Sequence, residues 1–169
     1  MADQRQPRVA RRADAVRAAA RLARVAGNAL AEAGLTLAQY RVLVFLDAGG
    51  RPASDVAGLL DVTPSTVTSV VDGLVAKGLL ERGADSSDRR RVVLALTDAG
   101  RDVLAEGDAV VAERLGRLLD RLDPDRGEGV LAGLESLNAA MELYLEERFG
   151  PQSGSTGSTG STGAAGSAG

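Results

Sequence analysis

The sequence contains neither cysteine nor histidine. Without these residue types the chain cannot form disulfides, the usual zinc sites, a thiol redox sensor or a histidine-based catalytic centre, and we expect no metal or other cofactor. Aromatic residues make up only 2% of the chain, so we expect a core of Leu, Val and Ala. No apolar run approaches membrane-spanning length. The basic N-terminus lacks a continuous apolar segment, so we expect no secretory signal and a cytoplasmic protein.

The end of the chain differs in composition from the rest. Residues 151–169 are dominated by Gly, Ser, Thr and Ala, with a repeated STG triplet. Such a segment has no side chains that could build a core, so we expect a flexible tail. Residues 1–150 are enough for one compact domain, and the 44% apolar content of the chain supports a packed core.

The charge is distributed unevenly along the chain. The net charge of −3 is unfavourable for a partner such as nucleic acid. Residues 1–101, however, hold 15 Lys and Arg against 11 Asp and Glu, a net charge of +4. Residues 102–150 hold 5 against 12, a net charge of −7. We therefore expect the basic and acidic parts of the chain to have different roles.

The periodicity of apolar residues predicts a mainly α fold with a small β-hairpin wing. Thr36, Thr63 and Thr97 are good helix N-caps, and Pro64 suits the first position of a helix. Gly78 suits a helix end, because a left-handed conformation there is easiest for glycine. The predicted helices span residues 9–33, 36–48, 53–60, 64–77, 98–122 and 124–149, and the predicted strands span 79–84 and 91–97.

The two short helices on either side of residues 61–63 have the spacing of a helix-turn-helix. The second of them would expose only short hydroxyl side chains in its first half, from Ser65, Thr66, Thr68 and Ser69. Such side chains let a helix sit deep in the major groove of DNA, and its N-terminus near Pro64 favours a phosphate. The alternative is an ordinary packed helix with solvent-facing hydroxyls.

The predicted hairpin that follows has a strongly charged tip. Arg89, Arg90 and Arg91 stand together after Asp88, and neighbouring residues of a strand point to opposite faces. One arginine could enter the minor groove while another meets a phosphate, and Asp85 or Asp88 could hold an arginine by a salt bridge. A solvated loop that protects an edge strand is the alternative. Directly after a helix-turn-helix, the charged hairpin favours a winged helix.

Three consecutive blocks of the chain resemble the MarR family of bacterial transcription regulators. They are "LTLAQYRVLVFL", "ASDVAGLLDVTPSTVTSVVDGLVAKGLLER" and "DSSDRRRVVLALTDAGR", and the resemblance covers about residues 10–148. It implies a homodimer bound to a pseudo-palindromic operator on double-stranded DNA, usually a repressor released by a small molecule. Residues 36–97 would form the DNA-binding lobe, and residues 9–33 and 98–149 the dimerisation helices.

The resemblance also implies roles for single residues. Ser65, Thr66, Thr68 and Ser69 match the recognition-helix contacts, and Arg90 matches the wing arginine of the minor groove, flanked by Arg89 and Arg91. The family's ligand pocket lies between the dimer helices and the DNA-binding lobe, and our candidates there are Arg17, Arg21, Arg24 and Tyr40. Arginines would suit an anionic aromatic ligand, although ordinary surface arginines also explain the first helix.

Two other classes of function were weighed against a DNA-binding regulator. A winged-helix module that binds proteins and not DNA would need no wing arginines, and three stand side by side here. An enzyme would need a nucleophile motif, a phosphate-binding loop or a convincing pair of carboxylates, and we find none of these in the sequence. We therefore expect a regulator and not an enzyme.

Overall fold

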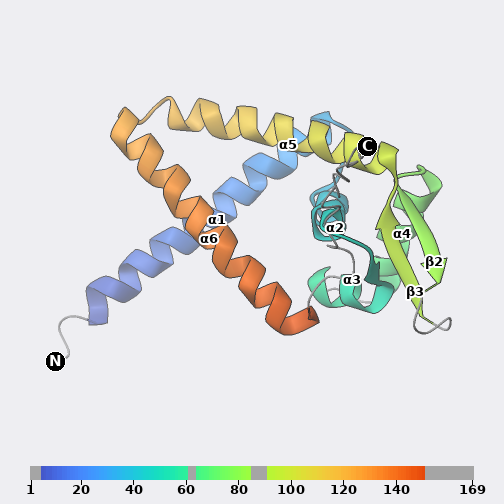
Figure 1. The fold of residues 1–169 in the computed structure, drawn as a ribbon. Helices are drawn as coiled ribbons and strands as arrows, with labels where there is room; N and C mark the ends of the chain where they lie inside the picture. The colour runs from blue at the N-terminus through green and yellow to red at the C-terminus, as the bar shows by residue number, and fades with distance from the viewer. Residues whose placement is uncertain (1–4, 61–63, 85–90, 151–169) are drawn as a thin grey trace, which may run out of the picture.

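The computed structural model describes residues 5–60, 64–84 and 91–150, arranged as Figure 1 shows. It confirms the predicted fold class, a mainly α protein with a small β wing. The elements in chain order are α1 (Arg5–Glu32), α2 (Leu37–Asp47), β1 (Arg51–Pro52), α3 (Ala53–Leu60), α4 (Pro64–Ala76), β2 (Leu80–Ala84), β3 (Val92–Leu96), α5 (Asp98–Leu119) and α6 (Pro124–Phe149).

The sheet has one strand more than predicted. β2 and β3 form the predicted antiparallel hairpin, with Leu80 opposite Leu96. β1 was not predicted, and it pairs with the other edge of β3, Arg51 opposite Leu94. The order β1-β3-β2 therefore places β3 in the middle. Two residues, one of them proline, are too few to show the alternating pattern by which a strand is recognised.

The predicted ends of several helices are confirmed by their capping groups. Thr36 accepts a hydrogen bond from the backbone N–H of Gln39, whose side chain in turn accepts from the backbone N–H of Thr36. Thr97 caps α5 by accepting from the N–H of Gly100 at 3.0 Å. Gly78 adopts a φ of 71° after α4. The first turn of α5 needs glycine at position 100, because a Cβ there would collide with the carbonyl oxygen of Leu79.

α2, α3, α4 and the sheet surround the core of the winged lobe. Its side chains are almost all Leu and Val, as the composition predicted. Leu30 and Leu104 of the long helices join the same cluster, so α1 and α5 are anchored to the lobe near one end. The most deeply buried side chains are Leu30, Val42, Leu43, Leu46, Val56, Leu74 and Leu94.

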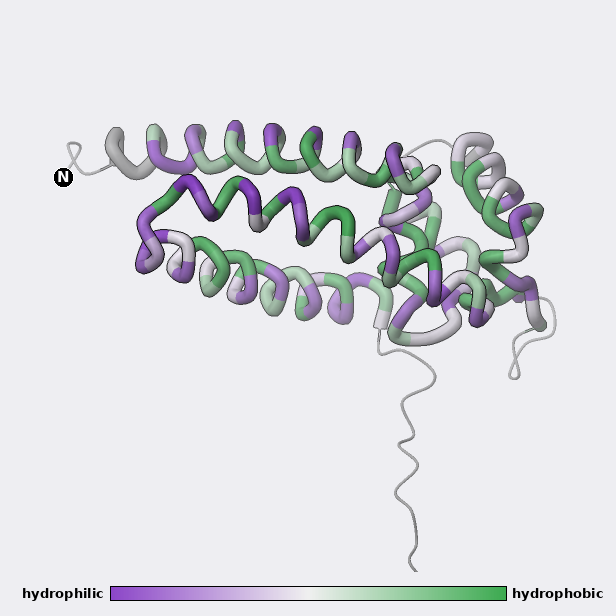
Figure 2. The backbone as a smooth tube through the Cα atoms, turned by 90° about the horizontal axis from the view of Figure 1, so that it is seen from above, coloured by the Kyte–Doolittle hydropathy of each residue, from purple (hydrophilic) through white to green (hydrophobic). Residues whose placement is uncertain are grey.

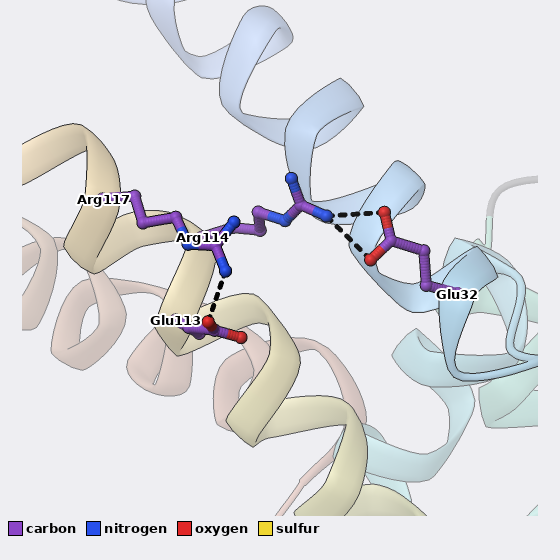
Figure 3. A network of polar contacts seen from close by, with 4 residues as sticks. All are labelled: Glu32, Glu113, Arg114 and Arg117. Carbon is purple, nitrogen blue, oxygen red and sulfur yellow. Dashed lines mark hydrogen bonds and ion pairs between the residues drawn. The ribbon is translucent and has the colours of Figure 1, made fainter.

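Three long helices extend away from the winged lobe. Figure 2 shows α1, α5 and α6 extending to the same side of the lobe, and Figure 1 shows that α1 and α6 cross each other in direction. Arg114 of α5 reaches α1, where its Nη2 donates to both carboxylate oxygens of Glu32 at 2.5 and 2.7 Å (Figure 3). α5 ends at Leu119, three residues earlier than predicted. Within the described residues no single helix is both long and apolar enough to cross a membrane; α1 and α2 pass that test only as a pair bent by 92°.

Much of the apolar surface of the long helices is not covered within the protomer. The predicted stripe of α1 is exposed at Val16, and the stripe of α5 is exposed at Leu118. α6 is the extreme case, because Leu137 and Met141 are 55% and 51% exposed. Apart from the residues near the lobe, these apolar stripes therefore do not form the interior of the protomer, although their spacing is that of a buried helix face. The exposed apolar residues of α6 are Val130, Leu131, Leu137, Met141, Leu143 and Tyr144.

Candidate nucleic-acid interface

α4 separates hydroxyl side chains from apolar ones. The predicted exposure of Ser65, Thr66, Thr68 and Ser69 is confirmed. Val67, Val71 and Leu74 are buried on the opposite side, which fixes the direction in which the hydroxyls point. Pro64 is the first residue of the helix, as predicted, and Thr63 lies outside the described residues. The outer face of α4 is therefore slim enough to approach a surface closely, whereas its role in binding stays a prediction.

The wing is described only in part. Arg91 is exposed and directly precedes β3. The other predicted wing residues, Asp85, Asp88, Arg89 and Arg90, lie outside the described residues. The described strand β2 follows α4 directly in the chain and contacts it. Figure 1 shows β2 and β3 next to α4 at one end of the molecule.

Two polar contacts fix the wing relative to α4. Arg82 of β2 donates a hydrogen bond to the carboxylate of Asp72 on α4, and both side chains are about half exposed. The hydroxyl of Thr97, which follows β3, donates to the carbonyl of Gly78 at 2.7 Å. The first contact could not be predicted from the sequence, because its residues lie ten positions apart with no local motif. α4 and the sheet therefore form one unit, as insertion into neighbouring grooves would require.

A cavity of about 1000 Å³ lies between α2 and α6. Tyr40 is one of the residues that line it, whereas its role in a ligand pocket stays a prediction. Arg17, Arg21 and Arg24 do not line it: Arg17 pairs with Asp14 at 3.0 Å, and the other two are exposed on α1. The arginines at the cavity come instead from α2, β1 and α6, and they are Arg41, Arg51 and Arg148.

Sequence reasoning missed these three arginines because they lie far apart in the chain. The arginines predicted for the ligand pocket, Arg17, Arg21 and Arg24, all belong to one helix. The cavity, by contrast, forms where the end of α6 approaches α2 and β1. Glu142 and Glu146 also line it, so its charged side chains carry three positive and two negative charges; with the apolar walls, the arginines can hold an organic anion. Within the described residues no group of three or more acidic side chains could hold a metal ion.

Tyr40 connects the winged lobe to α5. Its hydroxyl donates a hydrogen bond to Asp108 at 2.5 Å. Burial raises the pKa of Tyr40 far above its ordinary value, and the neighbouring Asp108 carboxylate raises it further. Gly107 leaves room for the ring, because a Cβ there would lie 3.2 Å from Tyr40 Cδ2. The phenol is therefore protonated at neutral pH and acts as a fixed hydrogen-bond donor.

In comparisons with known proteins, the match to a family model lies in the winged lobe. The sequence model of the MarR family matches residues 33–91. The HTH-type transcriptional repressor MdtR of Bacillus subtilis is 38% identical over 92 residues, 52% of this chain and 59% of MdtR. The HTH-type transcriptional regulator YkoM of the same organism is 30% identical over 105 residues, 62% of this chain and 68% of YkoM.

A solved structure extends the similarity to most of the fold. The transcriptional repressor CouR, bound to a 23-mer DNA duplex, is 34% identical with a TM-score of 0.60. The match covers 74% of this chain and 89% of that one. The chain spans between 55% and 68% of the length of the first curated relatives it matches, and they are named as transcriptional regulators, not as enzymes. From its sequence and its winged-helix fold together, the chain belongs to the MarR family of transcriptional regulators.

Proposed function

We propose that the protein is a sequence-specific DNA-binding regulator that acts as a homodimeric repressor on a pseudo-palindromic operator. The observation that carries this proposal is α4, a helix whose outer face bears short hydroxyls and whose position is fixed beside a wing. The similar repressor CouR is bound to a DNA duplex in its structure, which supports the same partner here. A protein that acts on chromosomal DNA would work in the cytoplasm.

In the proposed complex, α4 contacts the major groove of the DNA and the wing contacts the minor groove. Ser65, Thr66, Thr68 and Ser69 would contact base edges in the major groove, with a phosphate at the helix N-terminus near Pro64. Arg90 would enter the minor groove, while Arg89 and Arg91 bind phosphates. Asp85 or Asp88 would hold one of these arginines by a salt bridge.

The uncovered apolar surface of the long helices supports a homodimer. Val130, Leu137, Met141 and Tyr144 follow one another at helical spacing on α6, and all are exposed in the protomer. Apolar side chains exposed in such number mark an interface. We therefore propose that residues 9–33 and 98–149 form the dimer contact and residues 36–97 the DNA-binding lobe, with residues 151–169 as a tail. A dimer would place two α4 helices about one DNA turn apart, ~34–36 Å.

The cavity supports control by a small molecule. An organic anion held by Arg41 beside Tyr40 would contact α2 and α6 together, and hence both the proposed DNA-binding lobe and the proposed dimer helices. Titration calorimetry against a panel of phenolic acids tests this ligand class. We expect Arg41→Ala to weaken binding and Arg21→Ala to leave it unchanged. The opposite order would favour the pocket first predicted at Arg17, Arg21, Arg24 and Tyr40, and no binding in the panel would contradict this ligand class.

DNA binding itself is tested by selecting bound genomic fragments and then comparing variants on a selected fragment. We expect Arg90→Ala to weaken binding while the dimer stays intact in light scattering. Arg121→Ala is the matched control, because Arg121 is exposed in the turn between α5 and α6. A footprint unchanged by Arg90→Ala would contradict the role of the wing. A folded protein that selects no fragment would favour the alternative, a protein-interaction module.

A further inference from the structure

The C-terminal end of α6 is seated in the winged lobe. Phe149 contacts Phe45 of α2 edge to face, with ring centroids 5.4 Å apart. On its other side the ring fills the space above Gly58 of α3, where a Cβ would lie 2.9 Å from Phe149 Cε1. The end of α6 therefore contacts two helices of the lobe through one aromatic side chain, and a Cβ at position 58 would require this ring to shift.

Arg51 binds the same helix end from the sheet side. Its side chain is almost completely buried, at 3% exposure, and lies over the Phe45 ring at 5.0 Å from the centroid. Its Nη1 donates to the carbonyl oxygen of Gly150 at 3.2 Å and lies 3.5 Å from that of Phe149. The last carbonyls of a helix carry partial negative charge, so they stabilise a buried cation. In the described structure Arg51 Nε is buried without a hydrogen-bond partner.

Arg51 also belongs to the wing through the backbone. It forms β1 together with Pro52 and pairs with Leu94, in the central strand of the sheet. A displacement of the α6 end would therefore act on β3, the strand that Arg91 directly precedes. Elsewhere α6 is separated from α2 by the cavity, and only Leu145 and Phe149 of this helix pack against the core cluster.

We propose that Arg51 and Phe149 are positioning residues that hold the winged lobe at a fixed orientation to α6, and thereby fix the distance between the two α4 helices of the dimer. The proposal rests on the proposed function, because it assumes a dimer that binds two half-sites. The contact is peripheral to the core, because the buried cluster is formed by α2, α3, α4 and the sheet together with Leu30 and Leu104, and Phe149 only packs against it. The contact instead determines the orientation of the winged lobe relative to α6.

The absence of cysteine permits a direct distance measurement. A single Glu81→Cys substitution on the exposed face of β2 carries a spin label, and electron–electron resonance then gives the distance between the two wings of a dimer. We expect a narrow distribution for the parent chain and a broad one for Arg51→Met and for Phe149→Ala. Arg148→Met is the matched control, because Arg148 lies over the Phe149 ring, 5.3 Å from its centroid, but is exposed and hydrogen-bonded within α6.

Binding to DNA with altered half-site spacing supplies a second measurement. The parent dimer should prefer one spacing, and in both variants the ratio of affinities for the preferred and shifted spacings should fall toward unity. Far-ultraviolet circular dichroism checks that each variant is folded. If Arg51→Met is not folded, the measurements on Phe149→Ala test the proposal. Unchanged distances and spacing preference in a folded variant would overturn the proposal. If the parent protein binds no DNA, the proposed function fails, and the label distances still test the positioning role.

Discussion

At the scale of single residues, Tyr40 shows how the fold changes the chemistry of a side chain. The ring is half-buried between α2 and α5, and its hydroxyl donates to Asp108. Both burial and the carboxylate disfavour the phenolate, so they raise the pKa of Tyr40. The residue thereby links the lobe to α5 by a hydrogen bond that persists as long as the phenol keeps its proton.

This shift predicts a dependence of stability on alkaline pH. Above the ordinary tyrosine pKa of 10.0, the unfolded chain loses a proton that folded Tyr40 retains, so the free energy of unfolding should decrease as pH rises. Urea unfolding across this range should show a shallower decrease for Tyr40→Phe than for the parent chain. Tyr144→Phe is the control, because Tyr144 is exposed on α6. Equal slopes in all three proteins would contradict the coupling.

At the scale of elements, the ion pair between Asp72 and Arg82 matters for geometry more than for stability. Both side chains are about half exposed, and such pairs contribute about 0–1 kcal/mol. The pair nevertheless joins α4 to β2. The proposed contacts with neighbouring grooves of DNA depend on the relative position of these two elements.

The substitution Asp72→Asn distinguishes a positioning role of the ion pair from simple repulsion between the Asp72 carboxylate and DNA. Removing a carboxylate near DNA should strengthen binding if repulsion alone mattered. If the ion pair positions the wing, binding of an operator should weaken instead, with little change in the free energy of unfolding. Fluorescence anisotropy measures the affinity, and Asp102→Asn on the exposed face of α5 serves as a control. A tighter complex with Asp72→Asn would refute the positioning role.

The sequence predicted most elements because local chemistry determines their limits. Thr36, Thr97 and Gly78 form the capping contacts expected of them, and the exposed hydroxyls of α4 follow from its apolar stripe. β1 could not be predicted, because it exists only through pairing with β3. For the same reason the burial of Arg51 was unforeseen: its carbonyl partners lie nearly one hundred positions later in the chain.

At the scale of the whole molecule, α6 is a helix whose apolar side chains are largely exposed in the protomer. Its apolar side chains are spaced for burial, yet Leu137 is 55% exposed in the protomer. The resemblance to the MarR family implied dimerisation helices here, whereas the position of the cavity depends on where α6 ends and could not be predicted. The assignment of a ligand pocket to arginines on α1 stays a prediction, and the cavity between α2 and α6 is lined by other arginines.

A charge in this surface should disrupt the dimer. We expect Leu137→Glu to give a monomeric mass in light scattering and a lower affinity for an operator with two half-sites, because a buried unpaired carboxylate is unfavourable. Val92→Glu is the control: Val92 is also exposed and apolar, but it lies in the wing, so its variant should stay dimeric. A dimeric Leu137→Glu protein would place the interface elsewhere.

The dependence of operator affinity on salt tests the central claim most directly. The parent protein and a labelled fragment from the genomic selection are titrated at several salt concentrations, and light scattering gives the mass of the complex. The account predicts two protomers on one duplex and an affinity that falls linearly with salt on logarithmic axes, because the arginines displace counterions from phosphates. A folded protein that binds no selected fragment at low salt, or that binds with no dependence on salt, would contradict it.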